Sequence, residues 1–181
     1  NIFRGHDNVQ GATDVGPNPD SLPGYYGLAA GSWKHFAAAW GVDYAGIKKQ
    51  YAEGMMEKPG ITVSRWIDGV LEKNELIDQT SNIRGMFFWG HAPNSQTRGL
   101  EMKRAMDKLD LLVVVDPYPS ATAAMAAMPG KPEDLNPKRA VYLLPAATQF
   151  ETSGSCTASN RSLQWREKVI EPLWESRTDH M

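Results

Sequence analysis

The sequence predicts an α/β fold in which helices flank a mostly parallel sheet. Three short, continuous apolar runs are typical of strands that are buried on both faces, and helical patterns separate these runs. Strands that alternate with helices pair in parallel through right-handed crossovers. The expected order is a strand at 85–89, a helix at 97–108, a strand at 111–115, a helix at 121–127 and a strand at 140–144.

Loops and short helices are expected before this sheet. Three prolines predict an extended loop over 15–32, because proline lacks a backbone N–H and does not fit a helix interior. Ser32 is a suitable N-cap for a helix over 33–40, and Gly41 would end that helix.

Two more helices are expected between this region and the first strand. Asp43 is placed to cap a helix over 43–52. The clearest helical pattern begins at Thr62 or Ser64 and carries one apolar stripe, which places Trp66 in the core. The stripe consists of Val63, Trp66, Ile67, Val70 and Leu71.

The pattern also predicts which side of the helix over 97–108 is buried, and how the chain continues after the third strand. Residues 151–162 are small and polar and predict a loop, and a helix is expected over 163–175. The inward residues of the helix over 97–108 are expected to be Leu100, Ala105, Met106 and Leu109.

Composition excludes several classes of protein. The 181 residues are 41% hydrophobic and 22% charged, which is typical of a globular domain with its own core. A net charge of −2 offers no basic surface for nucleic acid. No apolar run approaches the roughly 20 residues of a membrane span. Cys156 is the one cysteine, so an internal disulfide or an iron–sulfur cluster held by this chain alone is excluded.

The carboxyl edge of the predicted sheet is the expected ligand site, since ligands of α/β sheets bind beyond the carboxyl ends of the strands. Asp116 ends the second strand, where a carboxylate could accept hydrogen bonds from a ribose diol or from a guanine edge. Alternatively, Asp116 caps a helix that begins near Ser120. No GxGxxG or Walker A motif follows a strand, which excludes an ordinary NAD fingerprint or a P-loop. The loops at this edge are 90–96, 116–120 and 146–160.

A second candidate site is the polar stretch over residues 1–14. Arg4 provides a permanent planar cation, and His6 provides a group that exchanges protons near neutral pH. This combination suits a small carboxylate ligand, and Gly5 and Gly11 would let the backbone approach it closely. The alternative is a surface loop with an ordinary ion pair.

Four motifs together resemble one family of enzymes. The segment from Arg4 to Asp14 resembles the active-site segment of molybdenum- or tungsten-dependent formate dehydrogenases, which belong to the dimethyl sulfoxide reductase family. Three other stretches resemble the molybdopterin oxidoreductase domain of the wider family. They are Phe88–Asn94, Val114–Pro119 and Leu144–Glu151.

This resemblance implies a Rossmann-like molybdopterin oxidoreductase domain. Residues 1–83 would form an active-site segment with a helical insertion. Residues 84–181 would form the α/β portion that binds the pterin guanine dinucleotide, within the same domain. The chain is then expected to be an internal piece of a larger catalytic subunit.

The resemblance also implies cofactors and partners. The family's catalytic subunit holds molybdenum or tungsten between two pyranopterin guanine dinucleotides (bis-MGD), and an iron–sulfur cluster is expected elsewhere in the full subunit. The implied reaction is oxidation of formate to carbon dioxide, or its reverse, with two electrons passed through the metal–pterin centre to iron–sulfur clusters. The implied partners are the rest of the catalytic subunit and an iron–sulfur electron-transfer subunit.

Individual roles follow from the same resemblance. Arg4 would orient formate, His6 would tune the pocket or relay a proton, and Gly5 would contact the cofactor. Val115 and Asp116 would contact the guanosine part of one cofactor. A loop near the same cofactor would contribute Gly90, His91, Ala92 and Asn94.

Ala92, Thr152 and Cys156 stand out against the family pattern. Relatives often have an asparagine before the proline where this chain has Ala92, so either His91 or Asn94 would make the polar contact to the cofactor. Thr152 would also lie at the cofactor, but it stands where many relatives have a lysine, so a charged contact to the cofactor is expected to be missing. The metal ligand of the family, a selenocysteine or cysteine followed by a histidine, is not in this sequence. Cys156 has no histidine next to it and is expected to be a small buried thiol.

Two alternatives remain beside a formate dehydrogenase. The chain could be part of another oxidoreductase of the same family, although relatives that act on other substrates lack the arginine at Arg4. It could also be a non-catalytic nucleotide-binding α/β module. The wording of the motifs favours a periplasmic enzyme, with the cytoplasm as the alternative.

Overall fold

A computed structural model describes residues 6–51, 54–79, 81–91, 98–119 and 140–178. The chain forms two compact units. One contains Asn1–Ile61 with Gly154–Arg166, and the other contains Thr62–Ser153 with Glu167–Met181. The expected division at residue 83 into two portions of one domain stays a prediction.

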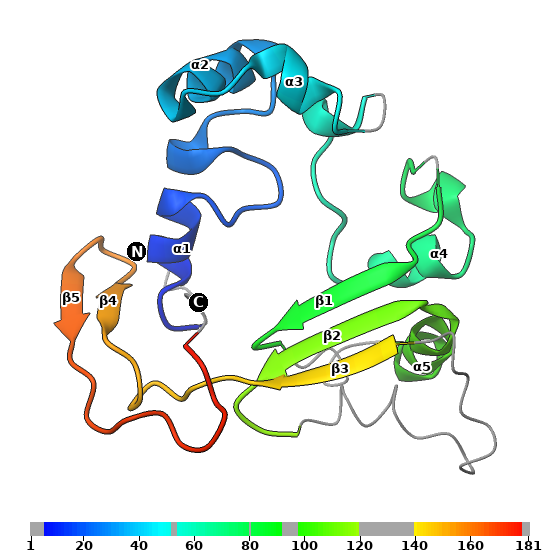
Figure 1. The fold of residues 1–181 in the computed structure, drawn as a ribbon. Helices are drawn as coiled ribbons and strands as arrows, with labels where there is room; N and C mark the ends of the chain where they lie inside the picture. Colours follow the sequence, from blue (N-terminus) through cyan, green and yellow to red (C-terminus); the bar gives the residue numbers. More distant parts are fainter. Residues whose placement is uncertain (1–5, 52–53, 80, 92–97, 120–139, 179–181) are drawn as a thin grey trace. The chain divides into compact units, whose positions relative to one another are not determined.

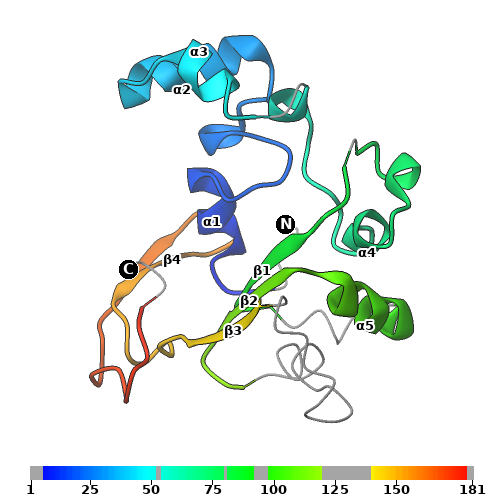
Figure 2. The ribbon, with the colours of Figure 1, turned by 45° about the vertical axis from the view of Figure 1, so that its right-hand side comes forward.

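The second unit is built on a three-stranded parallel sheet. Its strands are β1 (Gly85–Trp89), β2 (Leu111–Asp116) and β3 (Ala140–Pro145), in the order β1-β2-β3. Figures 1 and 2 show the three strands side by side and pointing the same way. The predicted parallel α/β sheet is therefore confirmed, while the helix expected at 121–127 lies outside the described residues.

Two helices accompany this sheet, α4 (Trp66–Val70) and α5 (Gly99–Lys108). The Trp66 ring meets Phe88 of β1 edge to face, with 5.7 Å between the ring centroids. Trp66 is 5% exposed, so its predicted place in the core is confirmed. The helix expected to begin at Thr62 or Ser64 is shorter than its apolar stripe, and Val63 is 50% exposed.

The buried side of α5 differs from the prediction at its first turn. Ala105, Met106 and Leu109 are buried as expected, but Leu100 is 82% exposed and Met102 is buried instead. The buried residues follow i, i+3, i+4 and i+7 from Met102, which is the spacing of one helix face. Leu100 lies off that face, so its predicted inward position is wrong.

The sheet is not covered on both faces by the residues that the structure describes. Phe88 and Val114 share a row of the sheet and are buried, whereas Phe87, Trp89 and Tyr142 are 61%, 55% and 53% exposed. Burial on both faces, as expected for β1 and β3, needs a second covering layer. An apolar run alone predicts the strand and not the presence of that layer.

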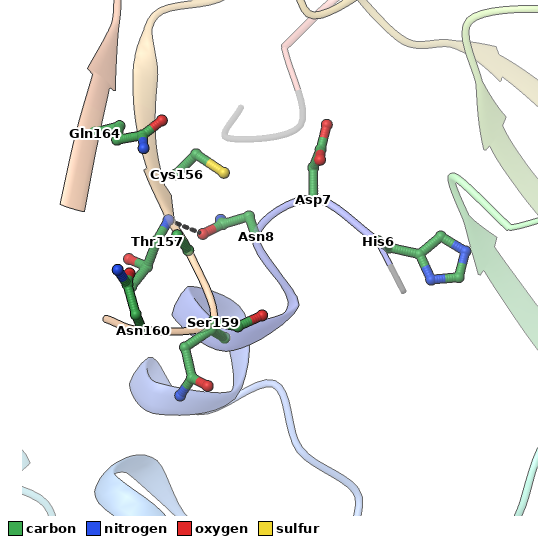
Figure 3. Close-up of a pocket in the computed structure, with 10 residues that line it drawn as sticks. His6, Asp7, Asn8, Cys156, Thr157, Ser159, Asn160 and Gln164 are labelled. Atoms are coloured by element: carbon green, nitrogen blue, oxygen red, sulfur yellow. Dashed lines mark hydrogen bonds between the residues drawn. The ribbon is translucent and has the colours of Figure 1, made fainter. Parts of the chain in front are cut away.

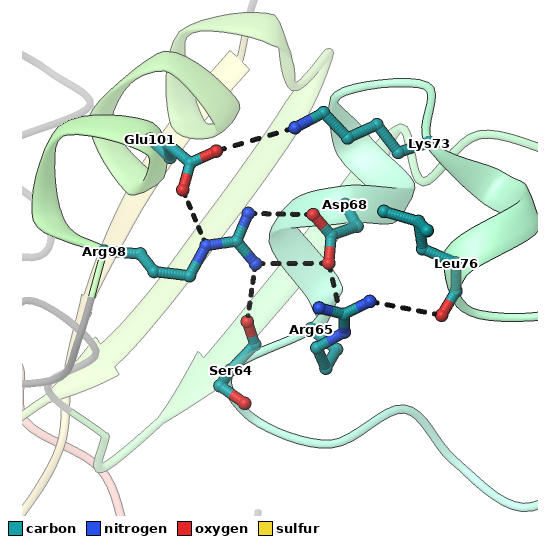
Figure 4. A network of polar contacts seen from close by, with 7 residues as sticks. All are labelled: Ser64, Arg65, Asp68, Lys73, Leu76, Arg98 and Glu101. Atoms are coloured by element: carbon teal, nitrogen blue, oxygen red, sulfur yellow. Dashed lines mark hydrogen bonds and ion pairs between the residues drawn. The ribbon is translucent and has the colours of Figure 1, made fainter.

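An ion-pair network joins α4 to α5 (Figure 4). Asp68 is 1% exposed, and its two carboxylate oxygens accept from the Arg98 guanidinium at 2.8 and 3.1 Å. Hydrogen bonds from Arg98 hold the pKa of Asp68 below its ordinary value. Arg98 also donates to Glu101 at 2.7 Å and to the Ser64 carbonyl at 3.0 Å, so the charge of Asp68 is compensated inside the unit.

The first unit contains short helices and a hairpin. The helices are α1 (Val9–Val15), α2 (Ala30–Trp40) and α3 (Tyr44–Lys48), with 3-10 turns η1 (Pro23–Tyr25) and η2 (Met55–Glu57). The hairpin pairs β4 (Gly154–Thr157) antiparallel with β5 (Leu163–Arg166). A further 3-10 turn of the second unit is η3 (Asn74–Leu76).

The predicted helix ends are partly right. The Asp43 side chain accepts from the backbone N–H groups of Ala45 and Gly46, which confirms it as the cap of α3. Gly41 ends α2 in the left-handed region at φ 67°, as expected. Ser32 is not an N-cap, because α2 begins two residues earlier, at Ala30.

The polar loop predicted over 151–162 contains β4, and the helix predicted over 163–175 does not form. Leu163 and Trp165 alternate with polar residues, which is the period of a strand. Pairing with β4 therefore makes residues 163–166 a strand. In the rest of the segment, Pro172 does not fit the interior of a helix. Within the described residues no helix is long and apolar enough to cross a membrane.

Candidate functional site

The segment His6–Asn8 lies against the end of β4 and the turn that follows it. A pocket of about 400 Å³ opens between these segments (Figure 3). His6 itself is exposed and lines this pocket. Its lining is mostly neutral and hydrogen-bonding, and consists of His6, Asp7, Asn8, Gln10, Cys156, Thr157, Ala158, Ser159, Asn160 and Gln164.

The sequence prediction for this site is partly open and partly corrected. Arg4 and Gly5 lie outside the described residues, so the predicted pairing of Arg4 with His6 stays a prediction. Cys156 is half-buried and lines the pocket, so its expected role as a small buried thiol is wrong. The side chains of the 156–164 hairpin were missed, because only tertiary pairing brings them beside residue 6.

A buried polar group anchors α1 beneath this pocket. Gln10 is 6% exposed and donates to Asp14 at 2.8 Å, and the Tyr25 hydroxyl donates to the same carboxylate oxygen at 2.7 Å. The Tyr25 hydrogen bond is the main cause that lowers the pKa of Asp14 below its usual range. The polar stretch from Val9 to Val15 therefore forms a helix in which Gln10 and Asp14 bind each other.

The carboxyl edge of the sheet forms the second candidate site, within the other unit. Gly90 has a φ of 54° and donates its N–H to the Val115 carbonyl at 2.8 Å. The Asp116 carbonyl accepts from Ala146 at 3.1 Å, and one Asp116 carboxylate oxygen accepts from the Tyr118 N–H at 3.0 Å. The side chain thus supports a local turn, and the helix it was expected to cap near Ser120 lies outside the described residues.

A pocket of about 340 Å³ lies at this edge. Trp89, Val115 and Leu144 stand in one row across the three strands and form its apolar wall. Arg177 is held beside the end of β3, because its N–H donates to the Pro145 carbonyl at 3.1 Å and its carbonyl accepts from Ala147 at 2.7 Å. The remaining lining residues are Pro145, Glu175, Arg177 and Thr178.

Of the predicted cofactor residues that the structure describes, Val115 alone lines this pocket. His91 stacks on Phe88 with 6.2 Å between the ring centroids, and Thr152 is half-buried. Ala92 and Asn94 lie outside the described residues. The sequence analysis did not predict Trp89 or Arg177 as site residues. Trp89 could have been predicted, because it ends the apolar run of β1 at the carboxyl edge, whereas no sequence pattern marks Arg177.

Glu151 has a structural position beside the predicted site. It is 4% exposed and accepts from the Thr148 N–H at 2.6 Å and from the Leu173 N–H at 2.9 Å. These backbone hydrogen bonds, first that of Thr148, lower the pKa of Glu151. Among the described residues no three His, Cys, Asp or Glu side chains gather in a way that could hold a metal ion.

Known proteins resemble this chain along nearly its whole length. Formate dehydrogenase H of Escherichia coli (strain K12) is 29% identical over 183 residues, which covers 99% of this chain and 21% of that protein. A Bacillus subtilis (strain 168) protein named "Probable oxidoreductase YjgC" is 29% identical over 179 residues, which covers 98% of this chain and 15% of that protein. The chain therefore spans about a fifth or less of the length of these relatives.

A family model described as molybdopterin oxidoreductase matches residues 8–181. The match includes the parallel sheet with its carboxyl edge and the β4–β5 hairpin beside α1. A domain of this kind implies a molybdopterin cofactor that carries molybdenum. Because the family model covers nearly all of the sequence, the chain belongs to the molybdopterin oxidoreductase family.

Proposed function

We propose that this chain is part of the catalytic subunit of a formate dehydrogenase. The observation that carries the proposal is the likeness to formate dehydrogenase H, which extends over 99% of the chain at 29% identity. The pocket beside His6 supports it, because this pocket lies where the resemblance of the Arg4–Asp14 segment implies a substrate. The proposed reaction is oxidation of formate to carbon dioxide, or its reverse.

The proposed cofactor is molybdenum or tungsten with two pyranopterin guanine dinucleotides. The residues at the carboxyl edge of the sheet fit the nucleotide end of such a group. Trp89 offers a flat apolar surface to a ring, and Arg177 offers a planar cation to phosphate oxygens. Asp116 has a second carboxylate oxygen for which no partner is found among the described residues, and this oxygen suits N–H donors.

When it is bound, the metal–pterin centre supplies an acceptor for two electrons. Arg4 would hold the formate carboxylate with two parallel N–H···O bonds, which fixes both its position and its orientation. His6 would accept and release a proton at a ring nitrogen. The described residues that line the pocket include no Lys or Arg, so Arg4 would supply the cation that holds the formate charge.

Wider features of the enzyme belong to the same proposal. Electrons would leave through iron–sulfur clusters in the rest of the subunit and in an electron-transfer subunit. The residues of the active-site motif favour a periplasmic enzyme. Each of these features is testable only on a complete catalytic subunit; this chain spans 21% and 15% of the lengths of the two relatives.

The test is metal and cofactor analysis of the full-length native protein, followed by formate-dependent reduction of an artificial electron acceptor. Stoichiometric molybdenum or tungsten, released guanine nucleotide and formate turnover are expected. Metal and pterin without formate turnover would favour another oxidoreductase, such as the generic one that the B. subtilis name describes. Absence of metal and of guanine nucleotide would overturn the proposal and favour a non-catalytic nucleotide-binding module.

A further inference from the structure

We propose that Asn8 is a positioning residue for the substrate pocket: it ties the His6 segment to the end of β4, so that the two walls of the pocket meet. This inference rests on the proposed function, since the pocket matters only if His6 serves a substrate. Three observations in the first unit support it, and all of them concern described residues.

The first observation is a hydrogen bond between distant parts of the chain. The Asn8 side-chain oxygen accepts from the Thr157 backbone N–H at 2.9 Å, across 149 residues of sequence (Figure 3). Thr157 is the last residue of β4, and the pocket-lining turn begins directly after it. The bond therefore joins one wall of the pocket, at His6 and Asp7, to the other.

The second observation is how Asn8 is used at the start of α1. Asparagine is among the best N-cap residues, because its oxygen can accept from the first N–H groups of its own helix. Asn8 occupies the N-cap position, yet its side chain makes no capping hydrogen bond. Its φ of 57° lies in the left-handed region, which asparagine tolerates better than most residues. The side chain is thus directed to β4 and not to its own helix.

The third observation is the space left by Gly11. A Cβ atom at this position would lie 2.2 Å from the Asn8 side-chain oxygen and 2.9 Å from the Thr157 hydroxyl oxygen. No other residue permits this approach without moving the contact. Gly11 therefore lets α1 come close enough to β4 for the Asn8 hydrogen bond to form.

The consequence concerns His6, two residues before Asn8. The hydrogen bond and the left-handed turn at Asn8 set the direction in which the chain enters α1, and thereby the place of His6 at the pocket. Loss of the bond should let the His6 segment move away from the 156–160 wall. Misplacement of about 1 Å is enough to cost an enzyme up to a hundredfold in rate.

The experiment compares two variants of the complete, cofactor-loaded enzyme. Asn8→Gly keeps the left-handed backbone and removes the acceptor, whereas Asn8→Asp keeps an acceptor for the Thr157 N–H. We expect Asn8→Gly to lower kcat/KM for formate about tenfold when the rate is normalised to molybdenum content. The pH profile of kcat/KM should also shift. Asn8→Asp should keep most of the wild-type kcat/KM. Asn18→Gly is the matched control, since the Asn18 side-chain oxygen accepts from the Asp20 N–H within an exposed loop and, among the described residues, makes no contact with the pocket.

Normal kcat/KM and an unchanged pH profile in Asn8→Gly would overturn the inference, even if the variant were less heat-stable. If Asn8→Gly does not accumulate, Asn8→Ser replaces it, because the shorter hydroxyl does not span the same gap. A wild-type protein without metal, pterin or formate turnover would instead refute the proposed function. The two failures are therefore distinguishable.

Discussion

At the scale of single residues, Glu151 is a buried carboxylate that joins two segments of the chain and whose contribution to stability depends on pH. It is buried where the chain turns after β3, and it binds the backbone N–H groups of Thr148 and Leu173. Both hydrogen bonds favour the charged form, which is why its pKa is lowered. Glu151 therefore connects the loop after β3 to the segment near residue 173 through hydrogen bonds.

Glu151→Gln should loosen this loop, because an amide has one acceptor oxygen and presents N–H groups to a backbone donor. Since the folded pKa lies below the ordinary value of 4.5, the carboxylate stabilises the fold at neutral pH, and this stabilisation disappears as the pH falls through the folded pKa. Hydrogen exchange of residues 145–153 in the full-length protein should thus be faster in the variant at pH 7. The difference from wild type should narrow below pH 4.5. Exposed Glu57→Gln is the control. Equal exchange rates in Glu151→Gln and wild type at pH 7 would contradict this role of Glu151.

Arg4 provides the prediction for substrate binding. Arg4→Lys keeps the positive charge and removes the planar fork, so formate turnover in the complete enzyme should fall at least about tenfold, which corresponds to roughly 1.4 kcal/mol. Metal and pterin content should stay normal. Unchanged turnover would remove Arg4 from the site.

At the scale of elements, α4 and α5 depend on the ion pair between Asp68 and Arg98. A charge as buried as that of Asp68 is costly unless it is paired, and removal of one partner leaves the other uncompensated. The network also contains Arg65 at 3.2 Å from Asp68 and Lys73 at 3.6 Å from Glu101. Each helix thus contributes one carboxylate, and the cations come from residues that flank the two helices.

Asp68→Asn should therefore destabilise the second unit by on the order of 3 kcal/mol. The control is Asp107→Asn, which breaks the exposed pair with Lys103 on the same helix and should change stability by less than about 1 kcal/mol. Thermal denaturation of the full-length variants would measure both. Similar melting temperatures for the two variants would show that the buried pair is not the stronger contact.

At the scale of the whole molecule, the strands bring together side chains that are far apart in sequence. Trp89, Val115 and Leu144 meet because parallel register aligns the ends of β1, β2 and β3. Asp116 follows Val115 at the same edge, which is where α/β sheets bind ligands. The proposed cofactor site is thus a product of register and not of one motif.

Asp116→Ala tests this edge. It removes the carboxylate proposed to accept guanine N–H groups, so the purified full-length enzyme should retain less guanine nucleotide and less metal per polypeptide. Asp110→Ala, which loses an exposed pair with Arg84, is the control. Normal cofactor content with a lower melting temperature in Asp116→Ala would assign the side chain to its turn with Tyr118 alone.

The sequence by itself determined the parallel sheet, the burial of Trp66 and the cap at Asp43. Each depends on local information: continuous apolar runs, a helical stripe, or one acceptor beside free N–H groups. The motifs likewise sufficed to expect a molybdopterin oxidoreductase, and the family match confirms it. Arg4, Gly5, Ala92 and Asn94 stay predictions, since they lie outside the described residues.

Only the tertiary structure decided α1, the β4–β5 hairpin and the pockets. The sequence from Val9 to Val15 is polar and contains a glycine, so it carries no helical stripe, and its helix is held by Asn8, Gln10 and their distant partners. The segment expected as a helix over 163–175 pairs as a strand, because β4 offers it backbone hydrogen bonds. Contacts across 149 residues leave no local pattern, which is why the wall opposite His6 became visible only in the fold.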